Sequence, residues 1–163
     1  MTIARRGGIS REIEKRKLAN MDRRKSNELK KEYLRGYQQA LRREKFILEE
    51  INRLRARQTS VSVEYDGMPH DGGVSDLSDY VVALDSQIEK LYRAQLETVQ
   101  RYQEISGAVE QVPDDKEREL LQLRYLMGKR WEDVAELMGY VKRQVLRIHG
   151  DALLHFEIPA KEK

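Results

Sequence analysis

Two long apolar stripes at helical spacing, separated by a single loop, limit the folds open to this chain. Residues 58–75 between them are rich in Ser, Gly and Asp and contain Pro69, as expected of a connecting loop. The first stripe consists of Leu34, Tyr37, Leu41, Ile47, Leu48, Ile51 and Leu54. The second stripe consists of Leu77, Val81, Leu84, Ile88, Leu91, Val99, Tyr102 and Ile105. Two such helices bury each other's apolar sides best as an antiparallel hairpin.

Part of each stripe recurs in multiples of seven residues, which is typical of a coiled-coil seam. The repeat comprises Leu34, Leu41 and Leu48 in the first stripe and Val81, Ile88 and Tyr102 in the second. The seam is narrow and leaves room for a second hairpin, so we expect a homodimer. Gly36 is the expected weak point of the first helix, where the basic arm before it could hinge, because glycine lowers helix stability.

The composition favours long solvated helices over a compact sheet. Charged residues make up 36% of the 163 residues and apolar ones 39%, with only three prolines. Without cysteine the chain has no disulfide and no thiolate metal site. It has no run of eighteen apolar residues, and its amino terminus lacks the apolar core of a signal peptide. We therefore expect an all-α protein without a membrane segment, in the cytoplasm of a bacterial host.

The net charge of the chain is +3, but the charged residues are distributed unevenly along it. Residues 1–57 have a balance of +10, residues 58–128 of −8 and residues 129–163 of +1. The basic residues of the N-terminal arm include Arg5, Arg6, Arg11, Lys15, Arg16, Lys17, Arg23, Arg24 and Lys25. Such an arm would attract phosphates, with an affinity that falls steeply as salt rises. A solvated helix face or a disordered tail would show the same pattern, and both interpretations stay open.

The segment from Glu117 to Phe156 is patterned as a pair of short helices joined by a turn. Gly139 is suited to end the first helix in a left-handed conformation. The inward residues are Trp131, Val134, Ala135 and Met138 in the first helix and Val145, Ile148, Ala152 and Leu153 in the second. Basic and amide side chains at the start of the second helix could reach base edges in a DNA major groove. The alternative is an ordinary helix pair with a charged, solvated face.

The run ERELLQLRYLMGKRWEDVAELMGYVKRQVLRIHGDALLHF resembles sigma-70 region 4. From about Tyr37 onward the chain also resembles small phage regulators related to the ArpU and RinA late transcriptional activators. YDGMPHDGG (residues 65–73) and RIHGDAL (residues 147–153) are the most specific pieces of that resemblance. The resemblance implies a phage or prophage protein that binds DNA and influences transcription.

The sequence departs from that pattern at the two expected helix starts. Arg130 and Val141 stand where relatives place Ser or Thr, and neither side chain can accept a hydrogen bond from a helix-start amide. Each missing cap costs about 1 kcal/mol. Acidic side chains at residues 132–133 partly compensate. Three leucines also occupy commonly polar positions, as partly exposed residues or as an apolar patch for a partner subunit or polymerase: Leu137, Leu146 and Leu154.

Other chemistry has little support in the sequence. An acidic cluster surrounds one histidine in the central loop, comprising Asp66, His70, Asp71, Asp76 and Asp79. Its spacing matches no ligand framework and is ordinary turn chemistry, so we expect no metal. Phosphate-loop, dinucleotide and nucleophile motifs are absent, so we expect neither an enzyme nor a cofactor. His149 is expected on the charged side, near a phosphate or at the surface, and Trp131 against the segment with Leu120, Leu123 and Tyr125.

These patterns predict an all-α protein in which a long antiparallel coiled-coil hairpin precedes a C-terminal helix-turn-helix domain. The expected division is a flexible start (1–9), the basic arm and hairpin (10–108), the helix-turn-helix (109–158) and a tail (159–163). The hypothesis is a phage transcription regulator that binds double-stranded DNA, with the hairpin for dimerisation or RNA polymerase contact. Its expected DNA contacts are Lys129, Arg130, Lys142, Arg143, Gln144 and Arg147. Two alternatives are a phage terminase small subunit and a polymerase-binding protein that does not bind DNA.

Overall fold

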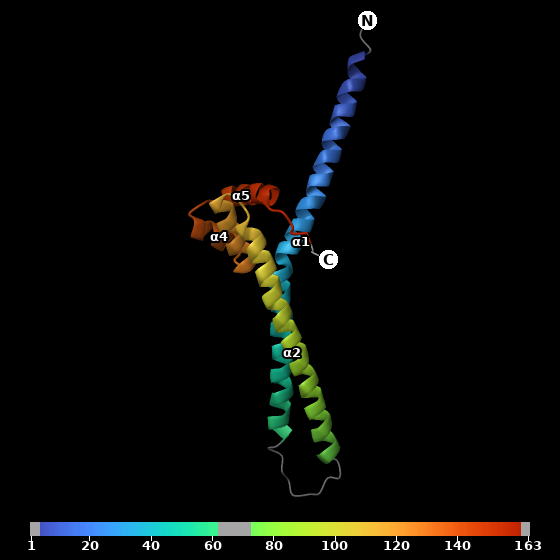
Figure 1. Cartoon of the computed structure of the whole chain (residues 1–163), viewed down its shortest axis with the longest axis vertical. Helices are drawn as coiled ribbons and strands as arrows, with labels where there is room; N and C mark the ends of the chain where they lie inside the picture. The colour runs from blue at the N-terminus through green and yellow to red at the C-terminus, as the bar shows by residue number, and fades with distance from the viewer. Residues whose placement is uncertain (1–3, 62–72, 161–163) are drawn as a thin grey trace. The chain divides into compact units, whose positions relative to one another are not determined.

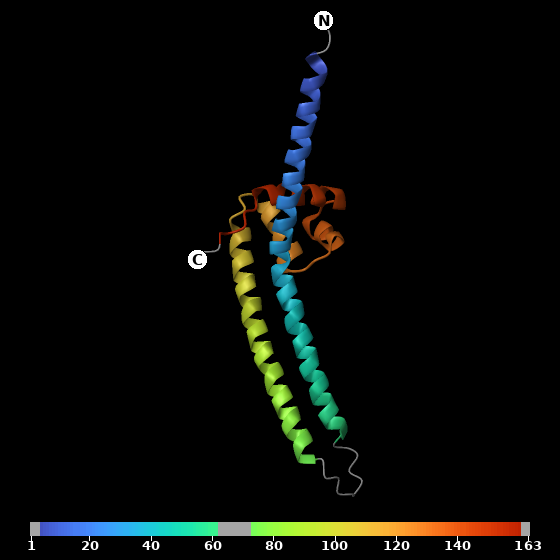
Figure 2. The same ribbon diagram turned by 90° about the vertical axis from the view of Figure 1, so that its right-hand side faces the viewer.

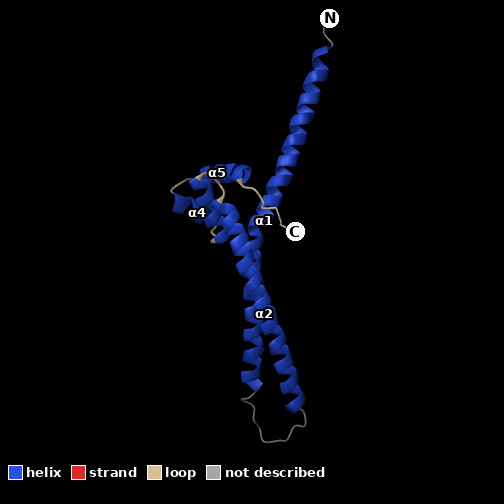
Figure 3. Cartoon of the chain, in the orientation of Figure 1, coloured by secondary structure: helices blue, strands red, loops and turns tan. Residues whose placement is uncertain are grey.

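All elements of the described structure are helices, as predicted. The computed structural model describes residues 4–61 and 73–160, with side chains described for 18–57 and 78–160. Figures 1 and 3 show helices joined by loops, and no strand occurs in these ranges. In chain order the elements are α1 (Ala4–Val61), α2 (Gly73–Glu110), α3 (Asp115–Leu121), the π-helical turn η1 (Gln122–Leu126), α4 (Trp131–Met138) and α5 (Lys142–His155).

The chain divides into two units, and the division crosses both long helices. Unit 1 contains residues 1–35 and 105–163, and unit 2 contains residues 36–104. Gly36, the expected weak point, is the first residue of unit 2, although α1 continues through it as a helix. The first helix starts at Ala4, inside the segment 1–9 that was expected to be flexible. The first part of α1 thus belongs with the C-terminal helices, whereas the sequence-based division placed it with the hairpin.

Unit 2 is an antiparallel pair formed by the second part of α1 and most of α2. The ring of Tyr37 meets that of Tyr102 edge-on with centroids 5.3 Å apart. Further along, Arg43 Nη1 donates to Glu97 Oε2 over 2.6 Å. Because residue numbers rise along one helix as they fall along the other, the two run in opposite directions. Figures 1 and 2 both show these helix segments side by side.

The seam of the hairpin has the predicted period but a different phase. In α1 its buried and half-buried residues are Tyr37, Ala40, Glu44, Ile47, Ile51 and Leu54. In α2 they are Tyr80, Leu84, Gln87, Leu91, Ala94, Thr98 and Arg101. Six residues of the predicted stripes lie in this seam: Tyr37, Ile47, Ile51, Leu54, Leu84 and Leu91. The predicted heptad repeat was wrong at Leu48, Val81 and Tyr102, which are all nearly half exposed. The contact is made around small residues, and Thr98 satisfies its buried hydroxyl by donating to the carbonyl of Ala94.

Unit 1 has the larger core. Its fully buried apolar side chains come from α1, α2, the C-terminal helices and the residues that follow α2 and α5: Leu34, Ile105, Val109, Val112, Leu120, Leu121, Val134, Val145, Ala152, Leu153 and Phe156. The ring of Phe156, at the end of α5, lies 6.1 Å from that of Tyr33. Lys30 Nζ donates to the carbonyl oxygen of Leu153 over 2.8 Å. A cation is favourable there because a helix C-terminus carries partial negative charge.

The approach to α4 is a capped helix that ends in a widened turn. Asp114 caps α3 by accepting hydrogen bonds from the amides of Lys116 and Glu117. In the π-helical turn that follows, the amide of Met127 donates to the carbonyl of Gln122, five residues back. Gly128 then adopts a φ of 68°, in the left-handed region that favours glycine, and the chain turns toward α4.

Candidate nucleic-acid interface

The two helices predicted for residues 131–155 are present, with Gly139 between them. Gly139 has φ 70° and ψ 28°, which confirms the predicted left-handed end of α4. The amide of Tyr140 donates to the carbonyl of Ala135, and that of Gly139 to the carbonyl of Glu136. These two bonds form a Schellman motif, which satisfies the last carbonyls of α4 and sets the direction of the chain into α5.

Helix α5 has one buried side and one exposed side. It packs against α3 and α4 with the buried residues Val145, His149, Ala152 and Leu153. Ile148, predicted to face inward with them, is only half-buried. The exposed residues of the other side are Arg143, Leu146, Arg147, Asp151 and Leu154. The buried residues hold the helix in place, so the exposed side is presented on a fixed support.

Both helix starts lack a side-chain cap, as predicted. Asp133 Oδ2 accepts a hydrogen bond from the backbone amide of Arg130 over 3.2 Å, which forms the return half of a capping box. The forward half cannot form, because a guanidinium has no acceptor. Val141 occupies the N-cap of α5 in extended conformation, and its carbonyl accepts from the amides of Gln144 and Val145. Its own side chain is 70% exposed and makes no cap.

Replacing Val141 by Ser is therefore expected to stabilise the protein. The introduced hydroxyl would accept a hydrogen bond from an amide in the first turn of α5, which is worth about 1 kcal/mol. That gain corresponds to a rise of about 2–4 °C in melting temperature, measurable by circular dichroism. Val141→Ala serves as the control, because it removes the side chain without adding an acceptor. A melting temperature for Val141→Ser no higher than that of Val141→Ala would contradict the cap assignment.

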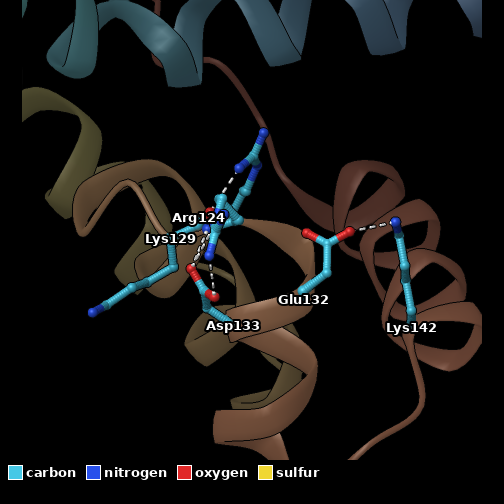
Figure 4. A network of polar contacts seen from close by, with 6 residues as sticks. Arg124, Lys129, Glu132, Asp133 and Lys142 are labelled. Atoms are coloured by element: carbon cyan, nitrogen blue, oxygen red, sulfur yellow. Dashed lines mark hydrogen bonds and ion pairs between the residues drawn. The ribbon is translucent and has the colours of Figure 1, made fainter.

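The six residues predicted to contact DNA fall into two groups according to their partners. Lys142 Nζ lies 2.6 Å from Glu132 Oε1 (Figure 4). Arg130 Nε lies 3.3 Å from Asp133 Oδ2. These cations lower the pKa of Glu132 and of Asp133 below the usual carboxyl value, and the largest cause in each case is the hydrogen bond between the two side chains. Both pairs join exposed side chains.

The second group makes no ion pair among the residues that the structure describes. Arg143 and Arg147 are both exposed, four positions apart on the outer side of α5. Lys129 is also exposed, and its carbonyl accepts from Arg124 Nη1 over 2.6 Å (Figure 4). Gln144 is half-buried. Among the six residues, the charges available to an outside partner are thus those of Lys129 and of the two arginines of α5.

The prediction that His149 lies on the charged side of α5 was wrong. His149 is 7% exposed, and its Nε2 lies 2.9 Å from the hydroxyl of Tyr125. Burial, together with the positive charges of Lys31, Arg124 and Arg35, lowers its pKa to about 4. The imidazole is therefore neutral at pH 7 and holds helices together instead of contacting phosphate. Spacings of four and three residues from Val145 to Ala152 include His149, and this was the signal that could have placed it inside.

Trp131 contributes to the same cluster from the start of α4. Its ring meets that of His149 edge-on at 4.8 Å, and the guanidinium of Arg124 lies 4.6 Å from its centroid. Trp131 was expected to pack against the segment that contains Tyr125, and it does contact Arg124 of that segment, in addition to His149 of α5. A guanidinium over an indole face is a cation–π contact. The side chain is half-buried in this arrangement, which links η1, α4 and α5.

A second histidine ties the end of α5 to the start of α3. His155 Nδ1 lies 2.7 Å from Glu117 Oε2, and Glu117 is buried. The hydrogen bond and the negative charge of Glu117 raise the pKa of His155 above its usual value. When it is protonated, this imidazole balances the negative charge of buried Glu117. Sequence reasoning did not identify this pair, because its partners are distant in the chain.

The remaining expectations concern leucines, the central loop and the N-terminal arm. Leu137, Leu146 and Leu154 are about half exposed, as expected. Asp66, His70 and Asp71 lie outside the described residues, as do the side chains of the arm up to residue 17. Within residues 4–61 and 73–160, no helix is long and apolar enough to cross a membrane.

Comparison with known proteins gives no relative for this chain. It matches no family model, no curated protein and no solved structure. Its function has to be inferred from the chemistry of the α5 surface and of the residues that support it.

Proposed function

We propose that this protein is a phage or prophage transcription regulator that binds double-stranded DNA, with α4 and α5 acting as a helix-turn-helix unit. The observation that carries the proposal is the pair Arg143 and Arg147. Both side chains project from one exposed side of α5, and neither has an ion-pair partner among the described residues. The resemblance to sigma-70 region 4 and to late phage activators supports the same function.

The start of α5 is electrostatically different from the starts of its neighbours. Helices α3 and α4 both carry acidic residues in their first turn, which offset the positive end of the helix dipole. Helix α5 has no acidic residue there and begins with Lys142 and Arg143. The helix dipole and the side chains therefore add up to positive potential at the same end. That combination favours an anionic partner such as a phosphate backbone.

The expected contributions of the six residues follow from their partners. Arg143 and Arg147 can approach base edges or phosphates without giving up an ion pair. Lys142 and Arg130 must exchange a carboxylate for a phosphate, but exposed ion pairs are worth only about 0–1 kcal/mol, so this exchange is accessible. Half-buried Gln144 is held closer to the support than the arginines are. We expect the largest losses of DNA affinity from substitutions at the two arginines.

Substituting Arg143 by Ala is the direct test. If Arg143 contacts a guanine, its loss should weaken binding to a specific site by about 1–3 kcal/mol, or roughly 5- to 150-fold. The specific site would come from selecting fragments of a parent phage genome with the purified protein, and the affinity from fluorescence anisotropy. Arg93→Ala is the matched control, because it removes an equally charged, exposed side chain from unit 2. That variant should bind as the unmodified protein does.

Salt dependence separates DNA binding from the polymerase-binding alternative. A protein that neutralises phosphates must lose affinity as salt rises, and Arg143→Ala should reduce that slope if it contacts the backbone. Equal affinity of Arg143→Ala and the unmodified protein, for both specific and random duplexes, would remove Arg143 from the interface. No binding of any duplex at low salt would contradict the proposal and favour the polymerase-binding alternative. Enrichment of a packaging origin would favour the terminase alternative.

A further inference from the structure

Unit 2 carries an exposed apolar surface that its own seam does not use. We call this surface the hairpin face; its exposed members are Leu48, Val81, Tyr92 and Val99, and the half-buried Leu41 and Ile88 complete it. Tyr92 is 68% exposed and Val99 is 52% exposed, although both lie in a regular helix. Steps of seven, four and seven residues connect the α2 members, and Leu41 and Leu48 are seven apart. The hairpin face therefore has the period of a second coiled-coil seam.

The two helices present these residues on the same side of the hairpin. At about 100° per residue, the α2 members lie roughly 110° around the helix from its seam, and Leu41 and Leu48 lie roughly 90° around α1 from its seam. When each helix is viewed from its own N-terminus, the hairpin-face residues are rotated from the seam in the same sense. Because the two helices run antiparallel, these rotations bring both sets of residues to the same side of the hairpin. The described residues of unit 2 thus leave an apolar strip spanning both helices uncovered, which is unusual for a surface that meets only water.

The charges of the hairpin indicate what covers this strip. The α1 part, residues 36–57, has six basic and three acidic residues. The α2 part, residues 73–104, has three basic and six acidic residues. The hairpin is therefore neutral overall, with one basic and one acidic helix. A second hairpin placed with its acidic helix over the basic helix of the first is complementary in both contacts, whereas pairing like helices would bring like charges together.

We propose that the hairpin face binds a second copy of this chain, with α2 of each copy over α1 of the other. A two-fold axis along the hairpin generates this arrangement and gives a four-helix bundle in which every neighbouring pair is antiparallel. Rotation about this axis leaves the position of each residue along the hairpin unchanged. Leu41 of one copy therefore lies level with Val99 of the other, near the level at which Arg43 meets Glu97. This association goes beyond the proposed DNA binding and does not depend on it.

The mass of the full chain in solution tests the association. Light scattering coupled to size exclusion should give twice the chain mass of 19.2 kDa. Val99→Glu should weaken the association by about 100-fold or more, because it places a charge in an apolar contact, and should leave a monomer. Val82→Glu is the matched control: Val82 is 66% exposed on the same helix but lies off the hairpin face, so this variant should stay dimeric. Circular dichroism should show equal helix content in both.

Disulfide trapping tests the orientation in an otherwise unchanged chain. The natural sequence has no cysteine, so one can be introduced alone. Leu41→Cys and Val99→Cys chains, mixed and oxidised, should form mainly the mixed disulfide. A predominant disulfide between two Val99→Cys chains would overturn the orientation, since it requires α2 over α2. A monomeric unmodified protein, a larger assembly, or a Val99→Glu variant that remains dimeric would overturn the proposal.

Discussion

The free energy of unfolding is expected to fall by about 3 kcal/mol as the pH is lowered from about 6.5 to about 4, through His149 alone. Its pKa is about 4 in the folded protein, against 6.5 for an unperturbed histidine. The unfolded chain therefore binds the proton first, and stability present above pH 6.5 is lost as the pH falls toward the folded pKa. A difference of about 2.5 in pKa corresponds to about 3 kcal/mol. Urea unfolding at a series of pH values measures it.

Two variants distinguish this effect from the general acid sensitivity of carboxylates. His149→Gln keeps a polar partner for Tyr125 without titrating, so its stability should decline less steeply between pH 6.5 and 4. In His155→Gln the stability should instead decline more steeply with acid than in the unmodified protein. The pKa of His155 is raised, so its contribution is full below pH 6.5 and is lost as the pH rises through the folded pKa. An unchanged acid slope in His149→Gln would show that the buried imidazole is protonated without cost.

Truncating Phe156 to Ala is expected to destabilise unit 1 by about 3–5 kcal/mol, as for other fully buried phenylalanines. Phe156 is 0% exposed, and its ring meets Tyr33 of α1. The substitution would leave a cavity where the end of α5 packs against α1. Ile158→Ala is the control, because Ile158 lies two residues further on and is 41% exposed. Chemical denaturation of both variants should show a large loss for the first and about 0.5 kcal/mol or less for the second. A similar small loss in both would contradict tight packing of the carboxy-terminal residues.

Local signals in the sequence predicted the individual helices better than the contacts between them. Gly139 was placed in the left-handed conformation because few other residues adopt it, and the structure confirms it. The missing cap at Val141 followed from side-chain chemistry alone, and it too is confirmed. Both features depend on residues that are adjacent in the chain, so no tertiary information was needed.

The phase of the hairpin and the position of His149 required knowledge of the partner helix. Large apolar residues such as Leu48 suggested one seam, but the helices meet around Ala40 and Ala94, whose small side chains permit a close approach. A seam made from small residues is hard to recognise by hydrophobicity. The polar imidazole of His149 suggested exposure, whereas its hydroxyl partner, Tyr125, lies on a different element. The ion pairs that divide the six candidate DNA-contacting residues into two groups were equally invisible in the sequence.

The π-helical turn at Gln122–Leu126 is a place where one residue can be deleted without disturbing the helices on either side. A π-type turn accommodates one residue more than an α-helical turn over the same rise, as the bond from the amide of Met127 to the carbonyl of Gln122 illustrates. Deleting one residue there would convert the turn to regular α-helix and leave both flanking segments in their present orientation. A deletion within α5 would instead rotate everything after it by about 100° and turn Leu153 out of the interior. Natural insertions and deletions in this part of the chain should therefore concentrate between α3 and α4.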